Sequence, residues 1–207
     1  MTRQYPIRSA RKAENRERLI VAAQELFQLK GYEATTLEGV AERAGVHSQT
    51  LYRHFKSKIE LAAAGDEVQL AHFQSAIEDK DRDDTTIQFW RKYLARAVEM
   101  ATGEDEGRSY REVLHQYLES PAISSQLVRI GSQYQALLSE SLERDLKVKE
   151  PTERAQTAHL IAITLWGAHD YVQRQHGRGE GVDLARETLA AVDRVEKLYA
   201  HVMGSTA

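Results

Sequence analysis

The chain has 207 residues, of which 42% are hydrophobic and 29% charged, as in a globular protein with enough length for one or two domains. It has no cysteine, which excludes disulfides, thiolate zinc sites and a cysteine nucleophile. No run approaches the roughly 18 apolar residues of a membrane span, and the first residues lack the apolar segment of a secretory signal, so we expect a cytoplasmic protein without membrane contact.

The net charge of −3 is unevenly distributed. Residues 1–58 hold 11 Lys and Arg against 6 Asp and Glu, whereas the remaining residues hold 17 basic and 25 acidic side chains. A basic N-terminal part on an acidic body is the asymmetry expected when one end of a protein meets phosphate. A chance partition of charge is the alternative.

The first predicted elements are three short helices. A basic arm, with Arg3, Arg8, Arg11 and Lys12, precedes an amphipathic helix that stops at Gly31. A second helix has the pattern of a capping box in TTLE (35–38), with Thr35 as N-cap and Glu38 reaching back, and it ends at Gly45. Gly39 inside this helix suggests close approach of a neighbouring helix, and a third helix follows from about residue 48 to 55.

Longer helices follow the third. Apolar periodicity predicts them at 58–79, 85–101, 109–119, 121–147, 151–175 and 183–203, with an acidic loop at 103–107. Proline at 121 and 151 suits the first position of a helix, and no convincing strand is found. The predicted fold is therefore all-α. It comprises an N-terminal three-helix domain (1–57) with a helix-turn-helix, and a C-terminal bundle of about six helices (58–207).

The stretch HSQTLYRHFKSK (47–58) is unusually polar for a segment between two apolar patterns. Leu51 and Phe55, four residues apart, face inward on a helix, so the other side chains are free to point outward. Gln and Arg can contact adenine and guanine edges in a DNA major groove, and Tyr, His and Lys can bind phosphates. The bland alternative is a solvated surface helix.

The run from Leu19 to Leu61 resembles the DNA-binding domain of the TetR family of transcriptional regulators. The motifs are IVAAQELF (20–27), GYEATT (31–36), VAERAGV (40–46) and TLYRHFKSKIEL (50–61). The resemblance implies a transcriptional regulator, most simply a repressor that a small-molecule ligand releases from a palindromic double-stranded DNA operator. A regulator that activates, or one without a ligand, is the alternative. An all-α interaction protein, with a purely structural helix-turn-helix, belongs to a different class.

The resemblance also implies roles for single residues. Base contacts are expected from Ser48, Gln49, Thr50 and Arg53. Phosphate contacts are expected from Thr36, Tyr52, His54 and Lys58.

Three positions depart from the family pattern. His47 stands where the family has Ser or Thr, so the cap of the third helix is expected to pass to Ser48. Gln49 stands where Gly is common, and Gly39 where the residue is usually larger.

The second domain of the family binds a small molecule and forms a homodimer through its last two helices. The helix from Pro151 is apolar or small on almost every side, so it needs cover from more than its own core. Aromatic side chains on the middle helices favour a small hydrophobic or aromatic effector. Candidates for a ligand pocket are Trp90, Tyr93, Tyr117, Tyr134, Trp166 and His169, with Met100 and Tyr171 as further candidates.

Enzyme, metal and cofactor functions are not predicted. The glycine-rich run GRGEG (177–181) lacks a preceding strand and a following Lys-Ser/Thr, as a phosphate-binding loop requires. The eight His have no metal-ligand spacing, and Ser139 and Ser141 have no nucleophile-elbow context.

Overall fold

The computed structural model describes residues 5–102 and 110–203, and this part of the chain is almost entirely helical. Between these described residues only one isolated bridge forms, from Leu146 to Met203, and no strand is present. The predicted loop at 103–107 and Arg3 lie outside the described residues. The helices are α1 (Tyr5–Lys30), α2 (Leu37–Arg43), α3 (Ser48–His54), α4 (Lys58–Ile77), α5 (Thr86–Thr102), α6 (Tyr110–Glu119), α7 (Pro121–Asp145), α8 (Pro151–Gly177) and α9 (Leu184–Tyr199).

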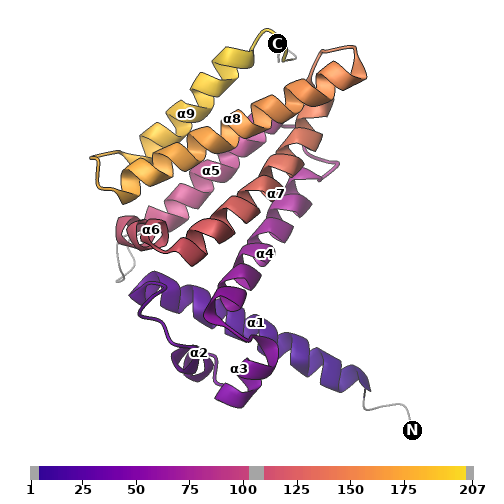
Figure 1. Ribbon diagram of the computed structural model, residues 1–207. Helices are drawn as coiled ribbons and strands as arrows, with labels where there is room; N and C mark the ends of the chain where they lie inside the picture. The colour runs from indigo at the N-terminus through magenta and orange to yellow at the C-terminus, as the bar shows by residue number, and fades with distance from the viewer. Residues whose placement is uncertain (1–4, 103–109, 204–207) are drawn as a thin grey trace.

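The helices are arranged in two groups that α4 connects (Figure 1). α1, α2 and α3 lie together at one end of the molecule, and α4 runs from this end into the group formed by α5 to α9. α8 and α9 pack against each other along one edge of that second group. The predicted all-α class, with three N-terminal helices and six that follow, is confirmed for the described residues.

Each group has its own hydrophobic core. The first is built from α1 to α4 and includes Leu19, Phe27, Leu51, Phe55 and Leu61, all almost fully buried. Each such side chain contributes about 1.5–3 kcal/mol by leaving water. Leu51 and Phe55 are the two anchors that the sequence predicts for α3, and they hold an otherwise polar helix in place.

The second core lies among α4, α5, α7, α8 and α9, around Phe73, Trp90, Leu138 and Ile161. α4 therefore contributes to both cores, with Leu61 in the first and Phe73 in the second. Since side chains at both ends of α4 are buried, a shift of this helix changes the packing of both groups.

The prediction that a basic arm precedes the first helix is wrong for the described residues, because α1 already begins at Tyr5. Arg8, Arg11 and Lys12 are therefore part of a helix, and Arg11 and Lys12 are exposed on it. Residues 10–18 are rich in Ala, Arg, Lys and Glu, which are strong helix formers. They carry no apolar stripe, so apolar periodicity does not predict a helix over them.

The predicted capping box is wrong by one residue. Thr36, not Thr35, is the N-cap of α2, and its Oγ1 accepts a hydrogen bond from the Gly39 N–H at 3.1 Å. The Thr35 hydroxyl is buried and donates instead to carbonyls at the end of α1, Leu26 at 3.2 Å and Gly31 at 2.8 Å. Thr35 therefore fastens the start of α2 to the end of α1.

The cap also explains why a glycine stands at position 39, and the explanation differs from the predicted one. A Cβ at Gly39 would lie 3.1 Å from Thr36 Oγ1, so it is the capping hydroxyl, not a neighbouring helix, that approaches closely. In α3 the N-cap is His47, without a side-chain capping bond, and Ser48 is the first helical residue. The expectation that Ser48 takes over the cap is therefore wrong.

Candidate functional site

The first candidate site is the outward face of α3. Gln49, Tyr52 and Arg53 are exposed, whereas Ser48, Thr50 and His54 are partly exposed at its margins. Arg53 Nη2 donates to Thr50 Oγ1 at 3.3 Å, so these two side chains share one side of the helix. The structure thus places all six predicted residues of α3 where a partner can reach them. Their contacts with DNA stay a prediction.

Tyr52 has an acidic partner on α2. Its hydroxyl donates to Glu38 Oε1 at 2.6 Å, across the angle between the two helices. The hydrogen bond lowers the pKa of the Glu38 carboxyl and raises the pKa of the Tyr52 hydroxyl. Glu38, which the sequence predicts as half of a capping box, instead orients Tyr52.

Lys58 forms hydrogen bonds within the protein, to the connection between α1 and α2. Its Nζ donates to the carbonyls of Tyr32 at 2.6 Å and Glu33 at 3.0 Å, and it lies 4.4 Å from the centre of the Tyr32 ring. The ammonium group therefore ties the start of α4 to the connection between α1 and α2. The Glu33 carboxylate also lies 4.0 Å from Nζ, so the predicted phosphate contact of Lys58 would have to compete with these partners.

The remaining predicted phosphate contacts lie at the same end of the molecule. Thr36 is exposed at the N-terminus of α2, and His54 is partly buried at the end of α3. Burial lowers the pKa of His54, and so do the nearby charges of Lys12, Arg16 and Arg53. The basic residues Lys12 and Arg16 of α1 therefore lie near the outward face of α3.

Arg16 is a residue that the sequence analysis did not assign. It is exposed, and its guanidinium lies 5.3 Å from the centre of the Phe55 ring. Lys12 and Arg16 are one helical turn apart on α1 and form, with Arg53, a positive group beside α3. The signal in the sequence is the spacing of four residues between Lys12 and Arg16, which puts two basic side chains on one face if this segment is helical.

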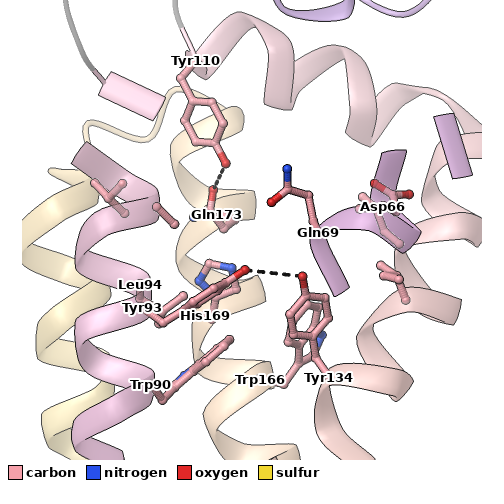
Figure 2. Close-up of a pocket in the computed structure, with 14 residues that line it drawn as sticks. Asp66, Gln69, Trp90, Tyr93, Leu94, Tyr110, Tyr134, Trp166, His169 and Gln173 are labelled. Carbon is pink, nitrogen blue, oxygen red and sulfur yellow. Dashed lines mark hydrogen bonds between the residues drawn. The ribbon is translucent and has the colours of Figure 1, made fainter. Parts of the chain in front are cut away.

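The second candidate site is a cavity of about 280 Å³ between α4, α5, α6, α7 and α8. Five of the six predicted pocket residues line it, namely Trp90, Tyr93, Tyr134, Trp166 and His169. The rings form two stacks, Trp90 with Tyr93 at 5.8 Å between centroids and Tyr134 with Trp166 at 5.2 Å (Figure 2). Such surfaces suit a planar hydrophobic molecule.

Three of the predicted candidates do not line this cavity. Tyr117 borders a second, smaller cavity of about 160 Å³, which also touches α1 through Gln24 and Phe27. Met100 is 85% exposed and Tyr171 is 61% exposed, so both point away from the interior. The identity of the residues that contact an effector stays a prediction.

A polar rim faces the aromatic rings, and the sequence analysis did not foresee it. Asp66 and Gln69 come from α4 and lie across the space from Tyr110 and Gln173 (Figure 2). The Tyr110 hydroxyl donates to Gln173 Oε1 at 3.1 Å, and burial raises the pKa of Tyr110 to about 12. The hydroxyls of Tyr93 and Tyr134 meet at 3.5 Å. The cavity thus combines aromatic faces with several groups that can form hydrogen bonds.

His169 lies edge-on to the rings of Trp90 and Trp166 at this cavity. Burial lowers its pKa to about 4, so the imidazole is neutral at physiological pH. Its Nδ1 is buried and has no hydrogen-bond partner among the described residues. A neutral imidazole with an unused ring nitrogen can accept or donate one hydrogen bond, depending on the tautomer.

The outer face of α8 and α9 carries apolar side chains in the open. Leu160, Ile163 and Tyr171 on α8 and Leu198 on α9 are exposed, and Gly167 lies on the same side of α8. A Cβ added to Gly167 would meet no atom within 4 Å. Packing within the described chain therefore does not explain why a glycine stands there.

Comparison with known proteins connects these sites to a family. The model of the family "Bacterial regulatory proteins, tetR family" matches residues 19–64. The regulator TtgW of Pseudomonas putida, an uncharacterized HTH-type transcriptional regulator, is 32% identical over 130 residues, which are 61% of this chain and 92% of TtgW. The chain belongs to the TetR family. It is a DNA-binding transcriptional regulator of helix-turn-helix type.

Further TetR-family relatives and solved structures extend the likeness. The HTH-type transcriptional activator FasR of Mycolicibacterium smegmatis is 28% identical over 155 residues, covering 73% of this chain and 69% of FasR. SmeT, the repressor of the Stenotrophomonas maltophilia multidrug efflux pump SmeDEF, has the same fold, with a TM-score of 0.63 and 24% identity over 92% of this chain and 91% of SmeT. A SmeT–triclosan complex superposes with a TM-score of 0.64 at 22% identity, covering 93% of each chain.

Two features are absent from the part of the chain that the structure describes. None of its helices is long and apolar enough to cross a membrane. Its His, Asp and Glu side chains also form no group of three or more that could hold a metal ion.

Proposed function

We propose that this TetR-family protein is a repressor that binds a near-palindromic operator as a dimer and leaves it when a small aromatic molecule enters the cavity. The observation that carries the proposal is the exposed polar face of α3, which two buried side chains, Leu51 and Phe55, hold in a fixed orientation. Such a helix can enter a major groove.

The DNA-binding part of the proposal assigns two kinds of contact. Ser48, Gln49, Thr50 and Arg53 face base edges, and Thr36, Tyr52, His54 and Lys58 face phosphates. We propose residues 1–57 as the DNA-binding domain and 58–207 as the domain for ligand and partner. This division follows the start of α4 at Lys58, and α4 connects the two domains because it contributes to both cores.

A homodimer through α8 and α9 is the second part. The exposed apolar group of Leu160, Ile163, Tyr171 and Leu198 supports it, since contiguous apolar patches mark interaction surfaces. Gly167 supports it further, because a glycine inside a helix costs about 1 kcal/mol relative to alanine and allows a second helix to approach closely. Two such helix pairs form a four-helix interface about a twofold axis.

The link between cavity and operator runs through α4. Asp66 and Gln69 of α4 line the cavity, and Lys58 at the start of the same helix is bonded to the α1–α2 connection. A ligand that prefers a different position of α4 would change the spacing of the two α3 helices from the roughly 34–36 Å of one DNA turn. The ligand would thereby lower DNA affinity, and the size of the effect is set by how much more tightly the ligand binds the state with the altered spacing.

A regulator that activates transcription is the second candidate. It is favoured by the relative FasR, which is an activator by name. The proposed DNA-binding surface is the same in both cases. Reporter expression with and without the protein separates them, since a repressor lowers expression and an activator raises it.

Selection of genomic DNA fragments on the purified protein, followed by gel retardation of the enriched sequence, tests the proposal. The expected result is one near-palindromic site that binds with strong dependence on salt concentration. If no fragment is enriched and no fragment is retarded at low salt, the chain is not the proposed DNA-binding regulator.

A further inference from the structure

The cavity has a single full charge among its described lining residues. Among the described lining residues Asp66 is the only Asp or Glu, and His169 is neutral because burial lowers its pKa. The described lining also holds no Lys or Arg. An anionic ligand would meet a carboxylate and no cation there, which opposes binding.

Asp66 is poorly compensated where it stands. Its Oδ2 accepts a hydrogen bond from Gln126 Nε2 at 3.2 Å, and it has no ion pair among the described residues. Arg129 does not bond Asp66 directly. Its Nε donates to Gln126 Oε1 at 3.1 Å, so Gln126 lies between the two charged groups. Removal from water raises the pKa of Asp66, against the opposing effects of Gln126 and Arg129. A carboxylate in this position gains from a positive partner.

The aromatic walls favour the same kind of partner. Trp90 stacks on Tyr93 and Tyr134 stacks on Trp166, and all four line the cavity that Asp66 borders (Figure 2). Ring faces attract cations, most strongly those of tryptophan, and they also stack on planar aromatic molecules. The two kinds of group together match a molecule that has both a flat ring and a positive charge.

We propose that the effector cavity takes an organic cation, namely an aromatic ring system that carries a protonated amine, with Asp66 as the counter-ion. This inference rests on the proposed function, since it names the ligand class of the same cavity. The rings of Trp90, Tyr93, Tyr134 and Trp166 hold the aromatic part, and the amine reaches the rim on α4. Neutral phenols or alcohols of the same shape bind more weakly, and carboxylates weakest.

The position of Asp66 explains how such a charge would reach the DNA-binding part. Asp66 also borders the second cavity, whose opposite wall is formed by Gln24 and Phe27 of α1. The neighbouring Gly65 packs so closely on α1 that an added Cβ would lie 3.1 Å from Gln24 Nε2. A cation at Asp66 therefore acts on the turn of α4 that contacts α1.

The test uses three probes with one ring system and different charge. 1-Naphthylmethylamine, 1-naphthalenemethanol and 1-naphthoate are titrated into the full-length protein by isothermal calorimetry at neutral pH. We expect the amine to bind at least about tenfold more tightly than the alcohol, and the carboxylate to bind weakest. Equal affinity for amine and alcohol, preference for the carboxylate, or no binding of any probe would overturn the inference.

Two variants show whether Asp66 is the cause of the preference. Asp66→Asn keeps the shape of the side chain and should lower amine affinity about tenfold while the alcohol is little affected. Glu140→Gln is the control, because Glu140 is an exposed acidic residue on α7 that lines neither cavity, and it should leave all three affinities unchanged. If Asp66→Asn weakens all three probes equally, Asp66 only shapes the wall and the proposal is wrong.

Operator binding by the ligand-free protein is measured separately. Operator binding depends on α3 and not on the cavity. Failure to bind DNA would therefore contradict the proposed function without changing the order of the three probe affinities. If the protein binds its operator but does not bind the amine most tightly, the proposed function stands and the proposal of a cationic ligand is wrong.

Discussion

The hydroxyl of Tyr52 on α3 donates to Glu38 of α2 over 2.6 Å, which places a carboxylate on the surface proposed to face DNA phosphates. The pair keeps the Tyr52 ring in one orientation while the protein is free. It also sets a negative charge against the DNA backbone. A phosphate that binds the Tyr52 hydroxyl, as proposed, would therefore compete with Glu38 for it.

Removing the charge of Glu38 should strengthen DNA binding. Glu38→Gln keeps a hydrogen-bond acceptor for Tyr52 and removes a repulsion from phosphate, so we expect operator affinity to rise several-fold at low salt, less at high salt. Fluorescence anisotropy at two salt concentrations measures this. Glu140→Gln, an exposed position on α7 in the other group of helices, is the control for net charge. An unchanged or lower affinity for Glu38→Gln would place Glu38 away from the DNA.

The neutral His169 should make the protein sensitive to acid. Its folded pKa of about 4 lies below the ordinary 6.5, and the neighbouring Asp170 opposes this shift only in part. Between these two values the unfolded chain binds a proton that the folded chain does not, so stability falls as pH falls through this window. The loss is about 3 kcal/mol at most by linkage.

Urea unfolding at pH 7 and pH 4.5 tests this. His169→Gln, which cannot titrate, should lose about 2–3 kcal/mol less than the wild type over this interval. All other titrating groups are shared, so their effects cancel in the comparison. Identical losses of unfolding free energy in the two proteins would show that His169 is already protonated in the folded state at pH 4.5.

Gly131 on α7 makes room for an aromatic wall of the cavity. A Cβ there would lie 2.7 Å from Trp166 Nε1 and 2.8 Å from Cε2, closer than real contacts allow. Gly131→Ala should therefore displace the Trp166 ring from its stack on Tyr134 and destabilise the protein by about 1–3 kcal/mol, despite the better helix propensity of alanine.

Thermal unfolding checks the magnitude, and a second substitution checks the cause. Trp166→Phe shortens the ring, so the double variant with Gly131→Ala should be less destabilised than the sum of the two single changes. Strict additivity would mean that the overlap with Trp166 is not the origin of the effect.

The apolar face of α8 and α9 should carry the dimer. Ile163→Glu places a charge within the exposed apolar group and should convert the protein to monomers at micromolar concentration, as measured by light scattering. Val128→Glu is a matched control, because Val128 is 70% exposed on α7, outside that face. A wild-type monomer, or a dimer that tolerates Ile163→Glu, would contradict the interface.

The sequence predicted α3 well because its signal is local. Two apolar side chains four residues apart, among polar ones, can be buried in only one orientation of a helix. The choice between Thr35 and Thr36 as the cap was different, since two adjacent threonines both fit the pattern. It was decided by the carbonyls at the end of α1, to which Thr35 donates, and no local rule contains that contact.

The cavity was predictable only in part. Aromatic residues on α5, α7 and α8 are conspicuous in the sequence, and five of them do border one space. Asp66, Gln69 and Gln173 look like ordinary surface residues of long helices, and Tyr117 looks like a pocket residue. Which of them points inward depends on how the helices cross, and that is set by the packing of the whole bundle.

The most direct test of the account compares the operator with a scrambled duplex of the same composition, by anisotropy titration of the wild type and a Gln49→Ala, Arg53→Ala double variant. We predict that the wild type prefers the operator by about a thousandfold or more. The double variant should lose most of this preference while its salt-dependent binding to both duplexes persists. A double variant that keeps the full preference would show that α3 does not read the sequence.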